Sequence, residues 1–241
     1  MQGSKKGWFE TTHWSLVLAA GDSSDPRGRD ALSQLCRAYW PPVYSYVRSR
    51  GRGAEEARDL TQGFFATLLE KGYLKDARRE RGRFRSFLLA SVKHYLANEW
   101  DRERAQRRGG GVELIPLDVE TAESHCRLEP ADRETPETVY EKRWALTVVE
   151  QVLCRLESEM ERSGNAERFR RFRPMLTDEG GGTTYRELGN ELGMSESAVK
   201  VAVHRLRRRF GELLRDEVAH TVDRPDQVDA EIRHLLDVMG S

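Results

Sequence analysis

Apolar positions recur along most of this chain every three or four residues, which is the period of an amphipathic helix. Between about Ala54 and Lys71, the predicted core stripe consists of Ala57, Leu60, Phe64 and Leu68. From Phe84 onward, a further helix is predicted to turn inward Phe84, Phe87, Leu88, Val92, Tyr95 and Leu96. Alternation of the kind expected for a strand is not found over any useful length. The pattern therefore predicts an all-α fold.

The N-terminal segment shows the same helical period, interrupted by turn-forming residues. A short helix is predicted from Thr12 through Ala20, and a longer one from about Asp30 should turn inward Leu32, Leu35, Cys36 and Tyr39. Because proline lacks the backbone N–H of a helix, Pro41-Pro42 is expected to break or kink that helix before Val43. Gly51-Arg52-Gly53 marks a turn.

Residues 183–210 predict two helices joined by a tight turn. Thr184 and Glu187 form a T-x-x-E capping box, which begins the first helix. Gly193 is expected to end that helix and Ser195 to cap the next. Gly189 has no side chain where the second helix could cross closely. The second helix is predicted to bury Val199, Ala202, Val203, Leu206 and Phe210.

The far side of that second helix is basic. From Lys200 to Arg215 there are six Lys and Arg residues against one Glu, a net charge of +5 that exceeds what solubility requires. A short, capped, basic helix suits a DNA major groove, although an ordinary helical hairpin with a solvated basic face would share the pattern. The candidate DNA contacts here are Ser195, Ser197, Lys200, Val201, His204, Arg205 and Arg208.

Charge is strongly segregated although the net charge of the chain is zero. Residues 78–108 hold ten basic and four acidic residues, whereas residues 112–141 hold nine acidic residues and two Arg. The acidic stretch follows three glycines at 109–111 and contains Pro116, Pro130 and Pro136, as a linker would. We therefore predict two helical domains, residues 1–108 and 138–222, joined by a long acidic flexible linker, residues 109–137, with a helical tail at 223–241.

The first basic block combines an Arg-rich loop, residues 76–83, with the helix that follows it. Arg side chains position phosphates, and an exposed Trp stacks on an unpaired base. In the alternative reading, Trp100 only caps the core and the Arg side chains are solvated. The candidate DNA contacts of this block are Arg78, Arg79, Arg81, Arg83, Arg85, Lys93, Asn98, Trp100 and Arg102.

The helix predicted at 54–71 has an outer face that is neither apolar nor fully charged. Asp59, Gln62, Ala66 and Leu69 lie opposite the core stripe, with Phe65 on its flank. Such a mixed face indicates a protein partner. Coverage by a neighbouring segment of the same chain, such as the N-terminal helix, explains it equally well.

Several function classes are disfavoured by composition. The chain of 241 residues is 33% charged and has no apolar run of membrane-spanning length and no signal-peptide pattern. Cys36, Cys126 and Cys154 are odd in number and widely spaced, which indicates a reducing cytoplasm. His125-Cys126 lacks a second ligand pair, so no metal is expected, and no cofactor either. Clustered carboxylates, a phosphate-cradling Gly-rich loop and a nucleophile elbow are all missing, which argues against an enzyme.

Three motifs in order resemble those of a known family. Asp59-Leu60-Thr61-Gln62-Gly63-Phe64-Phe65 resembles the D-L-x-Q-x-x-F signature of bacterial sigma factors. Residues 84–88 with the basic helix after them resemble the segment that melts promoters and reads the minus-ten element. Residues 184–210 resemble the minus-thirty-five reader. Order, spacing and acidic linker look like those of the extracytoplasmic-function (ECF) sigma factors, over about Ala31 to Val222.

This resemblance implies a protein that binds core RNA polymerase, directs it to promoter DNA and helps to open the duplex, without being an enzyme. The polymerase contact of the family would fall on Asp59, Gln62 and Phe65, with Leu69 on the same helix. The minus-ten contacts would fall on the loop 76–83 and the helix through Arg108, and the minus-thirty-five contacts on Ser195 to Arg208. An anti-sigma partner is left open.

Two other function classes fit less of the sequence. A stand-alone dimeric helix-turn-helix regulator would explain residues 183–210 but neither the DLTQ helix nor the first basic block. A nucleic-acid enzyme lacks a plausible ligand set. The tail, with Val228, Ile232, Leu235 and Leu236 at near-helical spacing, either packs on the C-terminal domain or responds to a regulator.

Overall fold

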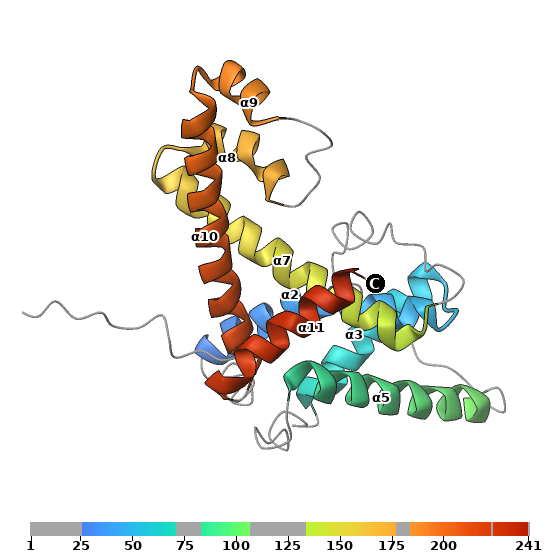
Figure 1. Ribbon diagram of the computed structural model, residues 1–241. Coiled ribbons are helices and arrows are strands. Elements are labelled where there is room, and N and C mark those ends of the chain that lie inside the picture. Colours follow the sequence, from blue (N-terminus) through green and yellow to red (C-terminus); the bar gives the residue numbers. More distant parts are fainter. Residues whose placement is uncertain (1–25, 71–82, 107–133, 177–183, 223, 241) are drawn as a thin grey trace, which may run out of the picture. The chain divides into compact units, whose positions relative to one another are not determined.

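The computed structural model describes residues 26–70, 83–106, 134–176, 184–222 and 224–240, and all regular elements within these ranges are helices (Figure 1). They are α2 (Pro26–Ser49), α3 (Ala54–Glu70), α5 (Phe84–Gln106), α7 (Pro136–Arg162), α8 (Ala166–Phe172), η2 (Arg173–Met175), α9 (Tyr185–Leu192), α10 (Glu196–Thr221), η3 (Pro225–Gln227) and α11 (Val228–Gly240). The all-α prediction is confirmed for this part of the chain. The predicted helix at 12–20 and most of the predicted linker lie outside it.

The chain forms two compact units. The first comprises residues 1–147 and 219–241, and the second comprises residues 148–218. The boundary falls inside α7 and again inside α10. These units are defined by packing, whereas the predicted domains were defined by charge and resemblance, so the predicted functional division stays a prediction.

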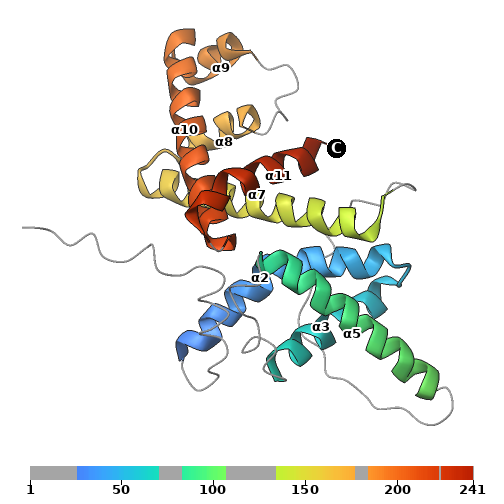
Figure 2. The ribbon, with the colours of Figure 1, turned by 60° about the horizontal axis from the view of Figure 1, so that its bottom comes forward.

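The first unit is built around α2, α3 and α5, which lie against one another in both views (Figures 1 and 2). The buried positions follow the helical period that the sequence pattern showed. On α5, Phe84, Leu88 and Val92 are buried, while Phe87, Tyr95 and Leu96 are half-buried. Aromatic edges join the helices, as where the rings of Tyr39 and Phe84 meet at 5.0 Å in a T-shaped arrangement.

Helix α2 runs without interruption through Pro41 and Pro42, so of the predicted break or kink the break is wrong. Two prolines remove two N–H donors from the helix, which costs free energy. Buried residues on both sides of the pair, among them Tyr39, Val43 and Val47, offset this cost because they hold the two halves of the helix against the same core.

The predicted turn at 51–53 is confirmed. Gly51 adopts φ 84°, a left-handed conformation that glycine takes without strain, and its N–H donates to the carbonyl of Arg48 at 3.0 Å. The Arg48 guanidinium donates to the carbonyl of Arg52 at 2.6 Å. The turn therefore sets the direction in which α3 leaves α2.

Helices α3 and α5 approach closely at Gly63, the fifth residue of the D-L-T-Q-G-F-F motif. A Cβ atom at this position would lie 2.4 Å from the Tyr95 hydroxyl oxygen, well inside contact distance. Burial and the nearby Glu99 carboxylate raise the pKa of Tyr95 to about 12, so the phenol stays neutral. An alanine at 63 would therefore force the Tyr95 side chain to shift.

The second unit contains α8, η2, α9 and parts of α7 and α10. Its buried side chains include Phe169, Phe172, Leu188, Val203 and Leu206. Arg207 of α10 donates to the carbonyl of Met175 at 2.8 Å and so ties η2 to the long helix.

The local signals around α9 and α10 are confirmed. The Thr184 hydroxyl accepts from the N–H of Glu187 at 3.2 Å, and the Glu187 carboxylate accepts from the N–H of Thr184 at 2.8 Å. Gly193 ends α9 at φ 63°. Ser195 accepts from the N–H of Ala198 at 3.2 Å and so caps α10. A Cβ atom at Gly189 would lie 2.7 Å from the carbonyl oxygen of Met194, as close packing at the turn requires.

The predicted tail helix is present as α11, in which Val228 and Leu235 are buried. It groups with the first compact unit and not with the second. That unit also holds residues 138–147 and 219–222 of the predicted C-terminal domain, so both alternatives for the tail stay predictions.

Candidate polymerase and nucleic-acid interfaces

Fewer residues are exposed on the outer face of α3 than the pattern predicted. Asp59 and Ala66 are exposed, and Gln62 is half-buried. Phe65 is only 6% exposed, because its ring stacks on Trp40 of α2 at 5.6 Å with the planes 14° apart. The placement of Phe65 beside the outer face is therefore wrong in this structure, where it belongs to the core. The Leu69 side chain lies outside the described residues.

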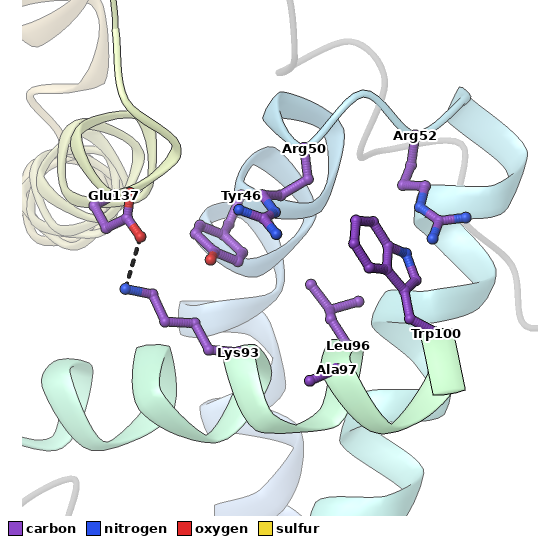
Figure 3. Close-up of a pocket in the computed structure, with 8 residues that line it drawn as sticks. All are labelled: Tyr46, Arg50, Arg52, Lys93, Leu96, Ala97, Trp100 and Glu137. Carbon is purple, nitrogen blue, oxygen red and sulfur yellow. Dashed lines mark ion pairs between the residues drawn. The ribbon is translucent and has the colours of Figure 1, made fainter. Parts of the chain in front are cut away.

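Trp100, near the end of α5, lines a pocket of about 360 Å³ (Figure 3). Its apolar walls come from α2 and α5, and its polar groups are three basic side chains and one carboxylate. The lining residues are Tyr46, Arg50, Arg52, Lys93, Leu96, Ala97, Trp100 and Glu137. A cationic pocket with an aromatic wall suits a planar ring that carries an anionic group.

Trp100 is 44% exposed and stands beside two guanidinium groups from the turn after α2. The Arg50 and Arg52 guanidinium carbons lie 5.9 and 5.4 Å from the indole centroid. This position suits a stacking role for Trp100, which stays a prediction beside the alternative in which Trp100 only caps the core. Sequence reasoning missed both arginines as site residues, although two Arg on either side of Gly51 were a visible signal.

Lys93 closes the other end of this pocket. Its Nζ lies 2.6 Å from a carboxylate oxygen of Glu137, at the start of α7. The hydrogen bond from Lys93 lowers the pKa of Glu137, so this carboxylate stays ionised and holds the lysine. Lys93 remains exposed and its ammonium group has three N–H donors, so a phosphate contact by Lys93 does not require Glu137 to leave.

Arg83, just before α5, and Arg85, in its first turn, are both paired with acidic side chains. Arg85 is 3% exposed and its Nε donates to Glu231 of α11 at 2.7 Å, while its Nη1 pairs with Glu141 of α7. Arg83, half-buried, also pairs with Glu231 at 2.8 Å. The prediction that Arg85 lies on an open surface is therefore wrong in this structure.

The remaining predicted contacts of the first basic block divide into two groups. Asn98 and Arg102 are exposed, and Arg102 pairs with Glu99 of its own helix at 3.5 Å. The loop residues Arg78, Arg79 and Arg81 lie outside the described residues.

The far face of α10 is exposed as predicted. All of its candidate contacts are solvent-accessible, from the cap through the first three turns: Ser195, Ser197, Lys200, Val201, His204, Arg205 and Arg208. Val201, an apolar residue, is 50% exposed. On the other side of the same turns, Val199 and Val203 are buried. Helix α10 thus exposes a polar face on which Val201 is the one apolar candidate contact.

Ion pairs within α10, and a cation–π contact with the preceding helix, hold part of this face. Lys200 pairs with Glu196 at 2.7 Å and lies 5.9 Å from the Tyr185 ring centroid. The hydrogen bond and charge of Glu196 raise the pKa of Lys200. Arg208 pairs with Glu212 at 3.2 Å. Within the described part of the chain, Arg205 makes no ion pair, so its guanidinium is available to an external anion.

The comparison with protein families bears directly on these surfaces. The family model for the ECF sigma factor matches residues 29–216, which is most of the chain. This chain belongs to the ECF sigma factor family. A search of curated proteins and a search of solved structures each returned no match.

As an ECF sigma factor, the protein acts in transcription initiation and its regulation, with core RNA polymerase and promoter DNA as the partners that the family implies. The predicted resemblance is confirmed. Within the described residues, no helix is both long and apolar enough to cross a membrane, and no group of three metal-binding side chains comes together.

Proposed function

We propose that this ECF sigma factor binds core RNA polymerase through the exposed face of α3 and reads promoter DNA at two places. The minus-thirty-five element would meet the far face of α10, and the minus-ten region would meet α5 with the loop before it. Residues 109–137 would act as the linker between the two DNA-reading domains, and 1–108 and 138–222 as those domains.

The observation that carries this proposal is the division of α10 into two faces. Val199, Val203 and Leu206 are buried, while the candidate contacts from Ser195 to Arg208 are exposed. The first turn is capped and the crossing at Gly189 is tight, so a rigid helix end is presented. Residues at the start of such a helix are the ones that reach base edges in a major groove.

The Trp100 pocket supports a role once DNA strands separate. A base stacked on the indole would lie beside Arg50 and Arg52, which would meet its phosphate. Stacking requires an unpaired base, so this contact would favour the open complex over the closed one. The pocket therefore supports assistance in promoter opening.

The polymerase contact is proposed on Asp59 and Gln62. Asp59 is exposed on a helix whose other side is core, and a carboxylate there can pair with a basic partner surface. Phe65 would contribute indirectly, by fixing α3 on Trp40 of α2, because its own ring is buried.

The proposal is tested by run-off transcription with core polymerase on genomic promoter fragments, combined with a direct binding assay for core polymerase. We expect defined transcripts and stoichiometric binding. The double variant Asp59→Ala, Gln62→Ala should bind core polymerase more weakly with unchanged helicity. A protein that binds DNA as a dimer but not core polymerase would instead be a stand-alone regulator, and the proposal would be wrong.

A further inference from the structure

A buried cluster of charges joins the start of α5 to α11, two parts of the first compact unit that are far apart in sequence. We call it the Arg85 cluster and define it as Arg83, Arg85, Glu141, Glu231 and His234. Glu231 has no exposed surface and accepts from Nε of Arg85 at 2.7 Å and lies 2.8 Å from Nε of Arg83.

Further contacts enclose the same arginine. The Arg85 guanidinium carbon lies 4.8 Å from the Trp144 ring centroid, and the Tyr140 hydroxyl donates to the Arg85 carbonyl at 3.0 Å. Glu141 pairs with Arg85 and lies 3.2 Å from Nε2 of His234. Helix α11 is thus attached by ionic bonds as well as by its apolar residues Val228 and Leu235.

The charges of the cluster depend on α11. With Glu231 present, two guanidinium groups face two carboxylates. Without it, Arg85 would keep only its pair with Glu141, and Arg83 would lose its pair with Glu231. A buried cation that loses its partner is strongly disfavoured unless another anion takes the position. The position of Glu231 is therefore an anion-binding site formed by two arginines.

The chemistry of this site also suits a phosphate. Guanidinium groups bind carboxylates and phosphates through the same charge-assisted hydrogen bonds. Arg83 lies just before α5 and Arg85 lies in its first turn. The minus-ten contacts are proposed on this helix. While Glu231 occupies the site, Arg85 has almost no surface to offer to DNA.

We propose that the Arg83–Arg85 site binds one anion at a time: the Glu231 carboxylate of α11 in the free protein, and a phosphate of promoter DNA in the initiation complex. Helix α11 is then an internal competitor of DNA, which rests on the function proposed above. If DNA binds only molecules in which α11 is displaced, the apparent affinity is the intrinsic affinity multiplied by the fraction of such molecules. A displaced fraction of about one in ten therefore weakens DNA binding about tenfold.

Amide hydrogen exchange on the full-length wild-type chain tests the displacement directly. Exchange in α11 is measured in the free protein and in the promoter complex with core polymerase. We expect the amides of 228–240 to be protected in the free protein and to lose protection in the complex. Equal protection of α11 in both states would overturn the competition.

A matched pair of variants tests the role of the carboxylate. Glu231→Gln removes the competing charge inside the cluster, whereas Asp237→Asn removes the same charge from an exposed position of the same helix. We expect Glu231→Gln to raise the affinity of the free protein for single-stranded promoter DNA by about three- to tenfold, and Asp237→Asn to leave it within about twofold. Equal effects of the two variants would overturn the proposal.

The outcomes separate this inference from the proposed function. Transcription by the wild type with α11 still protected would leave the proposed function standing and remove the competition. Failure of both wild type and Glu231→Gln to bind core polymerase would remove the proposed function itself. If Glu231→Gln does not fold, the exchange measurement on the wild type decides the question.

Discussion

Arg209 of α10 and Glu159 of α7 face each other through two hydrogen bonds of 2.8 Å, one from Nε and one from Nη2. This is the bidentate geometry that gives an arginine–carboxylate pair both strength and direction. Arg209 also donates to Glu212 at 3.1 Å. One of the six basic residues counted toward a DNA-binding helix therefore serves the packing of the second unit.

The first prediction compares two arginines four residues apart on the same helix. Arg209→Gln should lower the free energy of unfolding by about 0.5–1.5 kcal/mol, since both partners are partly exposed, and should affect DNA binding little. Arg205→Gln, at an exposed position, should weaken promoter binding without a change in stability. Denaturant unfolding and filter binding measure the two effects; a DNA defect for Arg209→Gln alone would contradict the assignment.

The second prediction concerns acid stability. The hydrogen bond from Arg209 lowers the pKa of Glu159 below its ordinary value of 4.5, with burial opposing the shift. The pair therefore stabilises the fold above pH 4.5 and loses this contribution as the pH falls through the lower, folded pKa.

The stability difference between wild type and Glu159→Gln should accordingly shrink from about pH 6 to about pH 3. Glu161→Gln, at an exposed position of α7, is the matched control and should show little difference throughout. Denaturant unfolding at several pH values makes the measurement. A difference that grows on acidification would contradict the role of the pair.

The third prediction concerns the turn between α9 and α10. Gly189→Ala places a Cβ atom 2.7 Å from a backbone oxygen, which cannot move cheaply, so it should destabilise the protein by about 1–3 kcal/mol. Gly211→Ala has open space around it within α10 and should be neutral or stabilising by up to about 1 kcal/mol. Thermal unfolding distinguishes the two; equal melting temperatures would show that the crossing is looser than described.

The fourth prediction concerns promoter opening. Trp100→Ala should spare the closed complex but slow opening, because stacking acts only on unpaired bases. Trp100→Phe keeps an aromatic face beside Arg50 and Arg52 and should retain much of the wild-type rate. Permanganate footprinting of the bubble follows the reaction. Opening by Trp100→Ala at the wild-type rate would remove the stacking role.

The fifth prediction concerns upstream sequence preference. Substitutions of Ser197 and Lys200, near the start of α10, should change which upstream element is preferred, by about 1–3 kcal/mol of discrimination. Arg208→Ala should weaken all promoters about equally, since phosphate contacts carry no sequence information. Selection from a promoter library tests both. A changed preference for Arg208→Ala alone would reverse the placement of the helix in the groove.

The features that the sequence predicted well are set by residues only a few positions apart along the chain. The capping box of Thr184 and Glu187, the left-handed Gly193 and the cap at Ser195 are all settled within one helical turn. The exposed face of α10 follows from the helical period alone. Periodicity assigns faces correctly when the core lies on one side of the helix.

What the sequence did not predict depends on partners far away along the chain. Phe65 is buried because Trp40 of another helix stacks on it, and Arg85 is buried because Glu231 lies 146 residues further on. Neither partner is visible in a local pattern. The proline pair in α2 shows the same limit, since buried residues on both sides outweigh a local preference for a break.

The close approach of Gly63 to the Tyr95 hydroxyl has an evolutionary consequence. Only 2.4 Å separates that oxygen from where a Cβ atom at 63 would lie, so a larger residue at 63 requires the Tyr95 side chain to shift or to be replaced. A relative with alanine at the first position should lack the hydroxyl at the second, with phenylalanine or a smaller residue there. The residue at 63 would then follow the residue at 95 on α5, whatever the other residues of the D-L-T-Q-G-F-F motif contact.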